Sequence, residues 1–325
     1  MAETLLDVRN LSTAFVNGSK KVTVVDDVSF SVAPGRTLAI VGESGCGKSI
    51  LSLSMIRLVP DTARTVGQIL MDGEDLAAVS PQRMRQIRGG KIGMIFQEPM
   101  TSLNPIMTVG AQLSEALKLH VPELNAAERH ERAVEGLRRV RLPAPEAQFH
   151  RYPHELSGGM RQRVMIAMAL SCEPELLIAD EPTTALDVTV QAEILALLGD
   201  LQRDTGMAVI LITHDLGVVA EFADEVMVMY AGRIVERGTV GEILSDPQHP
   251  YTIGLMGSIP RFGSDDRLLA IEGTVPALSA MPPGCRFAPR CVFAVPRCAG
   301  ESPVLREVTA GHAVSCHFAP LEDNL

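Results

Sequence analysis

The sequence predicts an α/β fold followed by a small, loop-rich carboxyl-terminal region, and three observations support this prediction. Short apolar runs of strand length alternate with segments of helical periodicity over most of the 325 residues. Many prolines, and four of the six cysteines, lie after about residue 246. One octet matches the pattern G-x-x-x-x-G-K-S at every fixed position: Gly42-Glu43-Ser44-Gly45-Cys46-Gly47-Lys48-Ser49.

The segment before the octet is expected to form a small antiparallel β-region. Its three short apolar runs are separated by turns, at residues 5–8, 22–25 and 28–32. Pro34-Gly35 predicts a further turn before the strand that leads into the octet. Phe15 lies about 27 residues before the octet. Its side chain is either part of the core or a surface on which an adenine base stacks, and the local pattern leaves both open.

The octet has the chemistry of a phosphate-binding loop. Gly42, Gly45 and Gly47 allow positive φ angles and leave room for oxygen atoms close to the main chain. The backbone N–H groups then point inward, next to the positive end of the following helix. Lys48 supplies a charge for the β- and γ-phosphates, and Ser49 supplies a hydroxyl ligand for Mg²⁺. The chain is therefore predicted to bind a nucleoside triphosphate.

Polar side chains follow three predicted core strands. These strands and the residues after them are 92–96 with Gln97, 176–179 with Asp180 and Glu181, and 208–213 with His214. Ligands of open α/β sheets bind at the carboxyl ends of the strands. Asp180 is expected to hold Mg²⁺ through water, and Glu181 to deprotonate the attacking water. Gln97 is placed to reach Mg²⁺ or that water. A solvated turn and a structural histidine are the alternatives.

Residues 106–170 are predicted to be mostly helical. Residues 126–140 interleave arginine and glutamate with periodic apolar positions, which favours a solvated helix face over a nucleic-acid patch. The turn Leu156-Ser157-Gly158-Gly159 opens a long helix through Leu170. Ser157 is a suitable N-cap, and the glycines expose backbone N–H groups to an approaching anion.

The composition excludes several classes of partner and site. A formal net charge of −10 and only 4% aromatic residues oppose nucleic-acid binding. The amino terminus has no secretory pattern, and no segment approaches the ~18 apolar residues of a membrane span. We expect a soluble, cytosolic chain that depends on other chains for any membrane crossing.

The tail contains four thiols in the spacing Cys285-x5-Cys291-x6-Cys298-x17-Cys316. In a cytosolic chain, such a group suggests a metal site before it suggests disulfides. Tetrahedral zinc, an iron–sulfur cluster and simply reduced cysteines are all compatible with four thiols. The tight C-x2–4-C pairs of zinc sites are absent, and the wider loops favour a cluster.

Taken in order and spacing, the motifs resemble the ATP-binding-cassette (ABC) nucleotide-binding domain over residues 5 to about 245. The resemblance includes the phosphate loop, Gln97, the Ser157–Gly159 signature, the Asp180-Glu181 strand end, Asp187 and His214. It implies a P-loop NTPase core of the RecA-like type, with an antiparallel β-subdomain and a helical subdomain at about 100–170. Kinases and GTPases share only the phosphate loop. Met160 stands where the commonest signature has glutamine.

The resemblance also implies how the residues act. Two cassettes face each other head to tail, and each ATP lies between one phosphate loop and the partner's signature. Catalytic roles fall to Glu181, His214 and Gln97, and Mg²⁺ is held by Ser49, Gln97 and Asp180. The implied nucleotide-binding set is Phe15, Gly42, Glu43, Ser44, Gly45, Cys46, Gly47, Lys48, Ser49, Ile50, Gln97, Asp180, Ser157, Gly158, Gly159 and Asp187.

Three further stretches resemble the ATPase subunits of bacterial dipeptide/oligopeptide importers: residues 97–105, residues 249–252 and the tail. This closer resemblance implies an ATPase that energises import of di- or oligopeptides. Nickel, glutathione or another small solute is the alternative cargo. The importer resemblance also divides the chain into a cassette at 1–245 and an extension at 246–325. It implies a [4Fe-4S] cluster, or alternatively Zn²⁺, in the extension.

The importer resemblance implies several partners. They are two transmembrane permease subunits, a second ABC ATPase that is a related paralogue rather than a copy, and, indirectly, an extracytoplasmic substrate-binding protein. The chain would then sit peripherally on the cytoplasmic face of the inner membrane, and its segment after Gln97 would meet a permease helix. A soluble, non-transport ABC ATPase acting on DNA or the ribosome is the competing class. One signature, no sustained heptads and the negative charge oppose that class.

Overall fold

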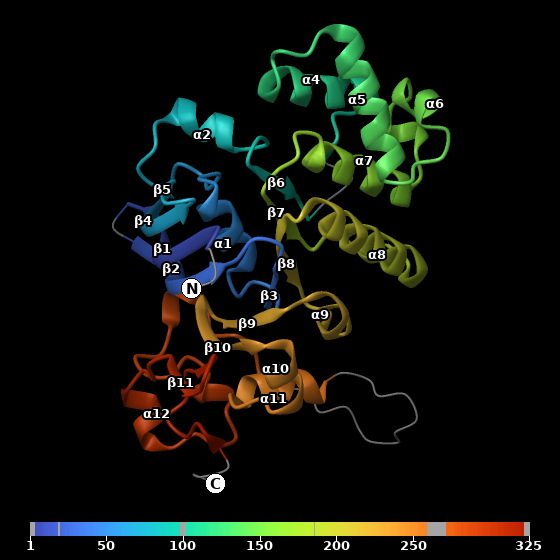
Figure 1. Ribbon diagram of the computed structural model, residues 1–325. Coiled ribbons are helices and arrows are strands. Elements are labelled where there is room, and N and C mark those ends of the chain that lie inside the picture. Colours follow the sequence, from blue (N-terminus) through green and yellow to red (C-terminus); the bar gives the residue numbers. More distant parts are fainter. Residues whose placement is uncertain (1–3, 19, 98–101, 185, 259–270, 322–325) are drawn as a thin grey trace. The chain divides into compact units, whose positions relative to one another are not determined.

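The computed structural model describes residues 4–18, 20–97, 102–184, 186–258 and 271–321. Figure 1 labels most of its helices and strands, which belong to two compact units. The first unit comprises Met1–Leu5, Val32–Arg36 and Ala78–Ile212. The second comprises Leu6–Ser31, Thr37–Ala77 and Thr213–Leu325. Both units are therefore assembled from segments that are distant in the sequence.

Parallel strands form the core of the first unit. They are β6 (Ile92–Ile95), β7 (Leu176–Asp180) and β8 (Ala208–Thr213), in the order β6-β7-β8. Every residue of β7 and β8 is buried, as expected for parallel strands covered on both faces. Because the strands are parallel, their carboxyl ends lie at one edge. The predicted α/β architecture is confirmed.

Helices account for most of the remaining first unit. They are α2 (Pro81–Ile87), α4 (Val109–His120), α5 (Ala126–Arg139), α6 (Pro145–Phe149), a 3₁₀ turn (Pro153–Glu155), α7 (Gly158–Leu170) and α8 (Val188–Thr205). In α5, Ala133, Val134 and Leu137 are buried, while arginines on its other face pair with acids, for example Arg132 with Glu173 at 3.3 Å. The predicted solvated helix face is confirmed.

An antiparallel sheet begins the second unit. Its strands are β1 (Leu6–Asn17), β2 (Lys20–Val32), β4 (Ala63–Met71) and β5 (Glu74–Asp75), in the order β2-β1-β4-β5. The expected antiparallel region is thus confirmed. The sequence suggested two runs where β2 is one strand, because Asp27 kinks it with a left-handed φ of 56°. The Asn10 amide stabilises the kink by donating to Asp27 Oδ1 at 2.9 Å.

The other strands of this unit combine parallel and antiparallel pairing. β3 (Thr37–Val41) lies parallel to β9 (Glu225–Tyr230), which pairs antiparallel with β10 (Arg233–Thr239). The tail adds β12 (His312–Val314) beside β10 and β11 (Arg306–Thr309) beyond it. The other helical elements are α1 (Lys48–Met55), α9 (Leu216–Phe222), α10 (Val240–Ser245), α11 (Pro250–Gly257) and α12 (Pro296–Gly300), with 3₁₀ turns at Leu278–Ala280 and Ala288–Arg290.

Aromatic side chains bind the tail to the core of the second unit. Tyr230 of β9, Tyr251 of α11 and Phe287 of the tail are all buried. Their ring centroids lie 4.7 Å (Tyr230–Tyr251), 5.2 Å (Tyr230–Phe287) and 5.5 Å (Tyr251–Phe287) apart. Such tilted and edge-on contacts add to the free energy of burying the rings. The tail is therefore packed into the core of the second unit and is not a separate loop-rich appendage.

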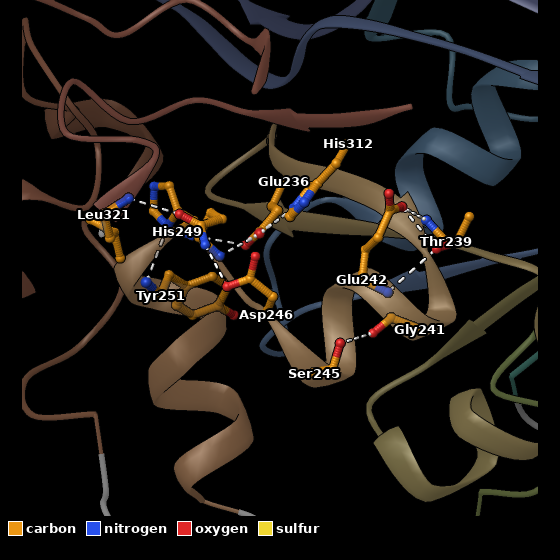
Figure 2. A network of polar contacts seen from close by, with 11 residues as sticks. Glu236, Thr239, Gly241, Glu242, Ser245, Asp246, His249, Tyr251, His312 and Leu321 are labelled. Carbon is orange, nitrogen blue, oxygen red and sulfur yellow. Dashed lines mark hydrogen bonds and ion pairs between the residues drawn. The ribbon is translucent and has the colours of Figure 1, made fainter. Parts of the chain in front are cut away.

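A buried polar network, shown in Figure 2, is the second attachment of the tail to the core of this unit. Glu236 of β10 is fully buried and accepts the backbone N–H groups of Gln248 at 2.6 Å and His249 at 2.9 Å. Its third partner is the His312 ring, at 2.8 Å. His312 is thus buried against the Glu236 carboxylate. The Gln248 side chain also accepts the backbone N–H of Leu321 at 2.8 Å.

Candidate functional site

The phosphate loop joins β3 to α1 in the predicted strand–loop–helix context. Gly42, Gly45 and Gly47 have φ angles of 152°, 77° and 109°, which confirms the expected positive values. A Cβ on Gly42 would lie 2.2 Å from the Met229 carbonyl oxygen, and one on Gly47 would lie 2.8 Å from that of Val24. Neither approach is possible for a larger residue. The glycines therefore let the loop fold tightly against β2 and β9.

Lys48 is buried at the start of α1, with its ammonium turned back over the loop. Its Nζ donates to the carbonyl oxygens of Gly42 at 2.7 Å and Glu43 at 3.1 Å. On the other side of the loop, the Gly232 N–H donates to the Cys46 carbonyl at 2.7 Å. Burial raises the pKa of the Cys46 thiol, which keeps it neutral beside the loop. The loop thus presents one buried cation and a row of backbone N–H groups, which is the chemistry of a polyphosphate site.

Two other predicted residues lie in the same unit as the phosphate loop. Phe15 is half-buried towards the end of β1, opposite Ala63 of β4. His214 is exposed in the turn between β8 and α9. The next residue, Asp215, caps α9 by accepting the Gly217 N–H at 2.8 Å. The aromatic and imidazole rings are therefore both accessible to a ligand.

Glu181 lies at the carboxyl edge of the first unit's parallel strands, in a strained backbone conformation. Its φ of 48° is left-handed, which is uncommon for a residue other than glycine. Its Oε2 accepts from the Gln97 amide at 3.0 Å and from the Thr184 hydroxyl at 2.8 Å. Asp180, directly before it, is 3% exposed. The structure thus brings Gln97 and Glu181 together at the strand ends, as the sequence predicts.

The signature turn lies in the same unit and begins α7 at the predicted residue. Ser157 caps the helix, and its hydroxyl accepts the Met160 N–H at 3.4 Å. Ser157 and Gly158 are exposed. A Cβ on Gly159 would lie 2.9 Å from Val190 Cγ1, so this glycine allows α7 to pack closely on α8. The backbone N–H groups at the start of α7 are accordingly presented at an accessible surface.

Three further residues, Asp187 and the unpredicted Gln162 and Thr184, form hydrogen bonds around the strand end and the signature helix. Asp187 caps α8, with its Oδ1 accepting the Val190 N–H at 2.9 Å. Gln162 of α7 is buried and donates to the Pro182 carbonyl beyond the strand end. Thr184 holds Glu181 as described above. No local pattern in the sequence distinguishes Gln162, because the fold alone brings it to Pro182. Thr184 lies only three residues after Glu181, and this spacing is the one signal that could have identified it.

The predicted site residues therefore form one set in each unit. The first unit holds the strand-end and signature residues Gln97, Asp180, Glu181, Ser157, Gly158, Gly159 and Asp187. The second unit holds the phosphate loop with Ile50, together with Phe15 and His214. Residues 98–101, directly after Gln97, lie outside the described part of the chain.

The four tail cysteines line one small, mostly apolar pocket together with Phe287, Phe293 and Phe318. None of the chain's six cysteines forms a disulfide. Burial, together with the three neighbouring cysteines, raises the pKa of the Cys291 thiol to about 11. Among the described residues, no group of three or more His, Cys, Asp or Glu side chains is arranged to hold a metal ion. The thiols are gathered, but not in the geometry of a single-ion site.

The fold and the site residues define an ABC-type ATPase. Residues 25–184 match the ABC transporter family. A dimeric ATP-binding cassette in a post-hydrolysis state, bound to ADP and phosphate, is 28% identical and covers 72% of this chain and 98% of its own, with a TM-score of 0.64. An ABC transporter component from Clostridium perfringens is 30% identical and covers 75% of this chain and 92% of its own, also with a TM-score of 0.64.

Within that class, the chain belongs to the peptide-import ATP-binding proteins. Residues 235–298 match the carboxyl-terminal region of oligopeptide/dipeptide transporters. A "Probable peptide ABC transporter ATP-binding protein" of Sinorhizobium fredii is 53% identical, covering 97% of this chain and 95% of the relative. A "Putative peptide import ATP-binding protein" of Brucella abortus is 51% identical, covering 96% of this chain and 94% of the relative. Across the described ranges, we find no helix with the length and apolar character needed to cross a membrane.

Proposed function

We propose that this chain binds and hydrolyses ATP to energise the import of dipeptides or oligopeptides. The observation that supports ATP hydrolysis is that one chain carries both a phosphate loop with a buried lysine and a strand-end glutamate fixed by two hydrogen bonds. The peptide substrate class rests on the names of relatives at 53% and 51% identity. In this proposal the cassette spans residues 1–245 and the extension spans 246–325.

The chain's own residues supply position and charge for the reaction. The N–H groups of the phosphate loop and the Lys48 ammonium bind the β- and γ-phosphates. Ser49, Gln97 and Asp180 would hold Mg²⁺, since hydroxyl, amide and carboxylate oxygens are its usual protein ligands. Mg²⁺, when bound, neutralises charge on the phosphates. Phe15 stacks on the adenine base.

Glu181 takes the proton of the attacking water. Thr184 and Gln97 each donate to Oε2 of its carboxylate, so the side chain is held in one orientation before the substrate arrives. His214 contacts the γ-phosphate. Most of the rate acceleration then comes from positioning and from charge stabilisation, as in other phosphoryl transfers.

Two cassettes complete each ATP site. The exposed Ser157 hydroxyl and the N–H groups of Gly158 and Gly159 bind the γ-phosphate of the nucleotide on the facing cassette, and Asp187 lies at the same seam. The dimeric, ADP-bound cassette among the similar structures supports this arrangement. ATP contacts both cassettes only in the closed dimer, so binding shifts the population towards closure and hydrolysis reverses the shift. The facing cassette is a related paralogue.

The cassette pair acts on membrane-spanning partners. Two permease subunits carry the peptide across the inner membrane, a substrate-binding protein delivers it from outside, and this chain sits on the cytoplasmic face. The test is reconstitution of the purified complex in proteoliposomes with labelled peptide outside. Peptide uptake that requires ATP supports the proposal. ATP-driven uptake of nickel or glutathione but not of peptide would establish the alternative cargo, and a chain that purifies with nucleic acid and without permeases would contradict transport altogether.

We infer that the four tail cysteines hold a [4Fe-4S] cluster, with zinc as the alternative. Cys285, Cys291, Cys298 and Cys316 line the same pocket, and their donor set suits either centre. Burial raises the pKa of the Cys285 thiol, while the backbone N–H groups of Phe287 and Ala288 lower it. Crowded thiolates in an apolar pocket repel one another, and a cationic centre would offset that repulsion. The centre would supply cross-links between loops, which is a structural role.

Replacing Cys285 with serine is expected to abolish the brownish absorbance of the purified protein. The substitution removes one of four ligands, and the tail loops lose a cross-link. Visible absorption spectra and iron analysis of protein purified without oxygen measure the effect. Cys172→Ser, outside the tail, is the matched control and should keep both colour and iron. A colourless wild-type protein with stoichiometric zinc would rule out the cluster.

A further inference from the structure

We propose that Arg290, in the cysteine-rich tail, is a positioning residue for ATP binding: it neutralises Glu43 and fixes the first turn of the phosphate loop. The inference rests on the proposed ATPase function and adds a residue more than 240 positions away from the loop in sequence. Arg290 ends the 3₁₀ turn Ala288–Arg290, directly before Cys291. Its Nη1 lies 2.9 Å from Glu43 Oε2, and Glu43 is the second residue of the loop.

The Arg290 guanidinium is held rigidly by the tail and by the core. Its side chain is 5% exposed. Nε donates to the Glu272 carbonyl at 2.9 Å and Nη2 to the Ile271 carbonyl at 3.2 Å. Its carbon Cζ lies 5.8 Å from the centre of the Tyr230 ring, within the range of a cation–π contact. The planar group is thus fixed before it meets Glu43, which a flexible lysine ammonium could not reproduce.

The backbone of Glu43 is fixed by the same region of the chain. Its N–H donates to the hydroxyl of Tyr251 at 2.8 Å, and Tyr251 is fully buried in α11. Its carbonyl oxygen accepts from Lys48 Nζ at 3.1 Å. Residues after position 246 therefore hold both the side chain and the backbone of Glu43. Through Glu43 they set the position of one of the carbonyls that orient Lys48.

Charge gives the contact its functional effect. A carboxylate in a phosphate loop repels the triphosphate, and the repulsion is strong where water is partly excluded. Glu43 is only 28% exposed, so solvent screens it incompletely. With Arg290 in place the pair is neutral overall. Without Arg290, the carboxylate is uncompensated beside the bound phosphates, and the loop also loses a point of attachment.

The test is a charge-compensation series on the full-length protein, measured as the affinity for MgATP in equilibrium titrations. Arg290→Gln should weaken ATP binding about tenfold, and Arg290→Lys should weaken it about threefold. The double variant Arg290→Gln/Glu43→Gln should return to within about threefold of wild type, because the uncompensated charge is gone. Arg297→Gln is the matched control: this tail arginine pairs with Glu301 at 2.8 Å and should leave the affinity unchanged.

The outcomes separate positioning from general stabilisation. Recovery of affinity in the double variant supports the proposal, since a purely structural loss would not be repaired by a second substitution. Affinity that is unchanged in Arg290→Gln, or equally weak in the double variant, overturns it. If Arg290→Gln does not fold, Arg290→Lys decides: binding about threefold weaker than wild type supports the proposal, and unchanged affinity overturns it. A wild-type chain that does not bind ATP would refute the proposed function instead.

Discussion

Replacing Glu181 with glutamine is expected to lower ATP turnover roughly 100- to 1,000-fold while ATP still binds. Glutamine has the same shape and keeps an oxygen that can accept from Thr184, but it cannot take a proton from water. The phosphate contacts of Lys48 and the loop are untouched, so affinity should stay within about twofold of wild type. ATP that binds without being hydrolysed should hold two cassettes together.

Phosphate release, ATP titration and gel filtration with ATP measure these three effects. Glu175→Gln is the matched control, because it makes the same change at the other end of β7, where Glu175 pairs with Lys91 at 3.2 Å. That variant should hydrolyse ATP at the wild-type rate. Turnover of Glu181→Gln within about threefold of wild type would remove Glu181 from the role of base.

The second large effect is expected on stability: Glu236→Gln should lower the free energy of unfolding by about 2–4 kcal/mol. Glu236 is fully buried and accepts from two backbone N–H groups and the His312 ring. A glutamine amide offers one oxygen and turns its NH₂ group towards another donor. At least one buried donor is then left without an acceptor. Urea unfolding of the full-length chain measures the loss.

The Glu236–His312 pair also gives this effect a pH dependence. The hydrogen bond to Glu236 raises the pKa of His312 above the usual 6.5. The pair therefore contributes fully below about pH 6.5, and its contribution is lost as the pH rises through the raised pKa. Burial lowers the pKa of His249 to about 4, so this neighbour stays neutral throughout that range. The stability difference between wild type and Glu236→Gln should therefore shrink as the pH rises above about 6.5.

Glu242→Gln is the matched control for this substitution. Glu242 closes a capping box with Thr239 at the start of α10, accepting its N–H at 2.8 Å (Figure 2). A glutamine oxygen can still accept that bond, so we expect a loss below about 1 kcal/mol. An equal loss in both variants, or a Glu236→Gln difference that does not change with pH, would contradict the buried ion pair.

Features that are determined by residues close together in the sequence could be predicted from it. The phosphate loop needs eight consecutive residues, and its glycines took the expected positive φ angles. Helix α7 begins after Ser157 and ends at Leu170 as expected, because a cap and an apolar pattern define it locally. Gln97 and Glu181 meet because parallel strands bring their carboxyl ends to one edge.

Features that depend on distant residues could not be predicted. Arg290 and Glu43 are separated by 247 positions, and nothing distinguishes Arg290 from its neighbours Arg286 and Arg297 in the sequence. The tail looked irregular because prolines interrupt every periodic pattern in it. Its strand β12 spans only His312–Val314, too short for a pattern to reveal, and its pairing with β10 stabilises it. The left-handed φ of Glu181 has no sequence signature either.

The small hairpin at the end of the chain has a practical consequence. Strand β12 covers the edge of β10, and β11 then ends that sheet with four residues that include Arg306 and Glu307. A long apolar strand with open backbone groups invites pairing with another molecule, and a short charged one discourages it. A cassette shortened to residues 1–245 would uncover β10. Its tendency to self-associate would follow from the cut itself and would say nothing about the chain's natural partners.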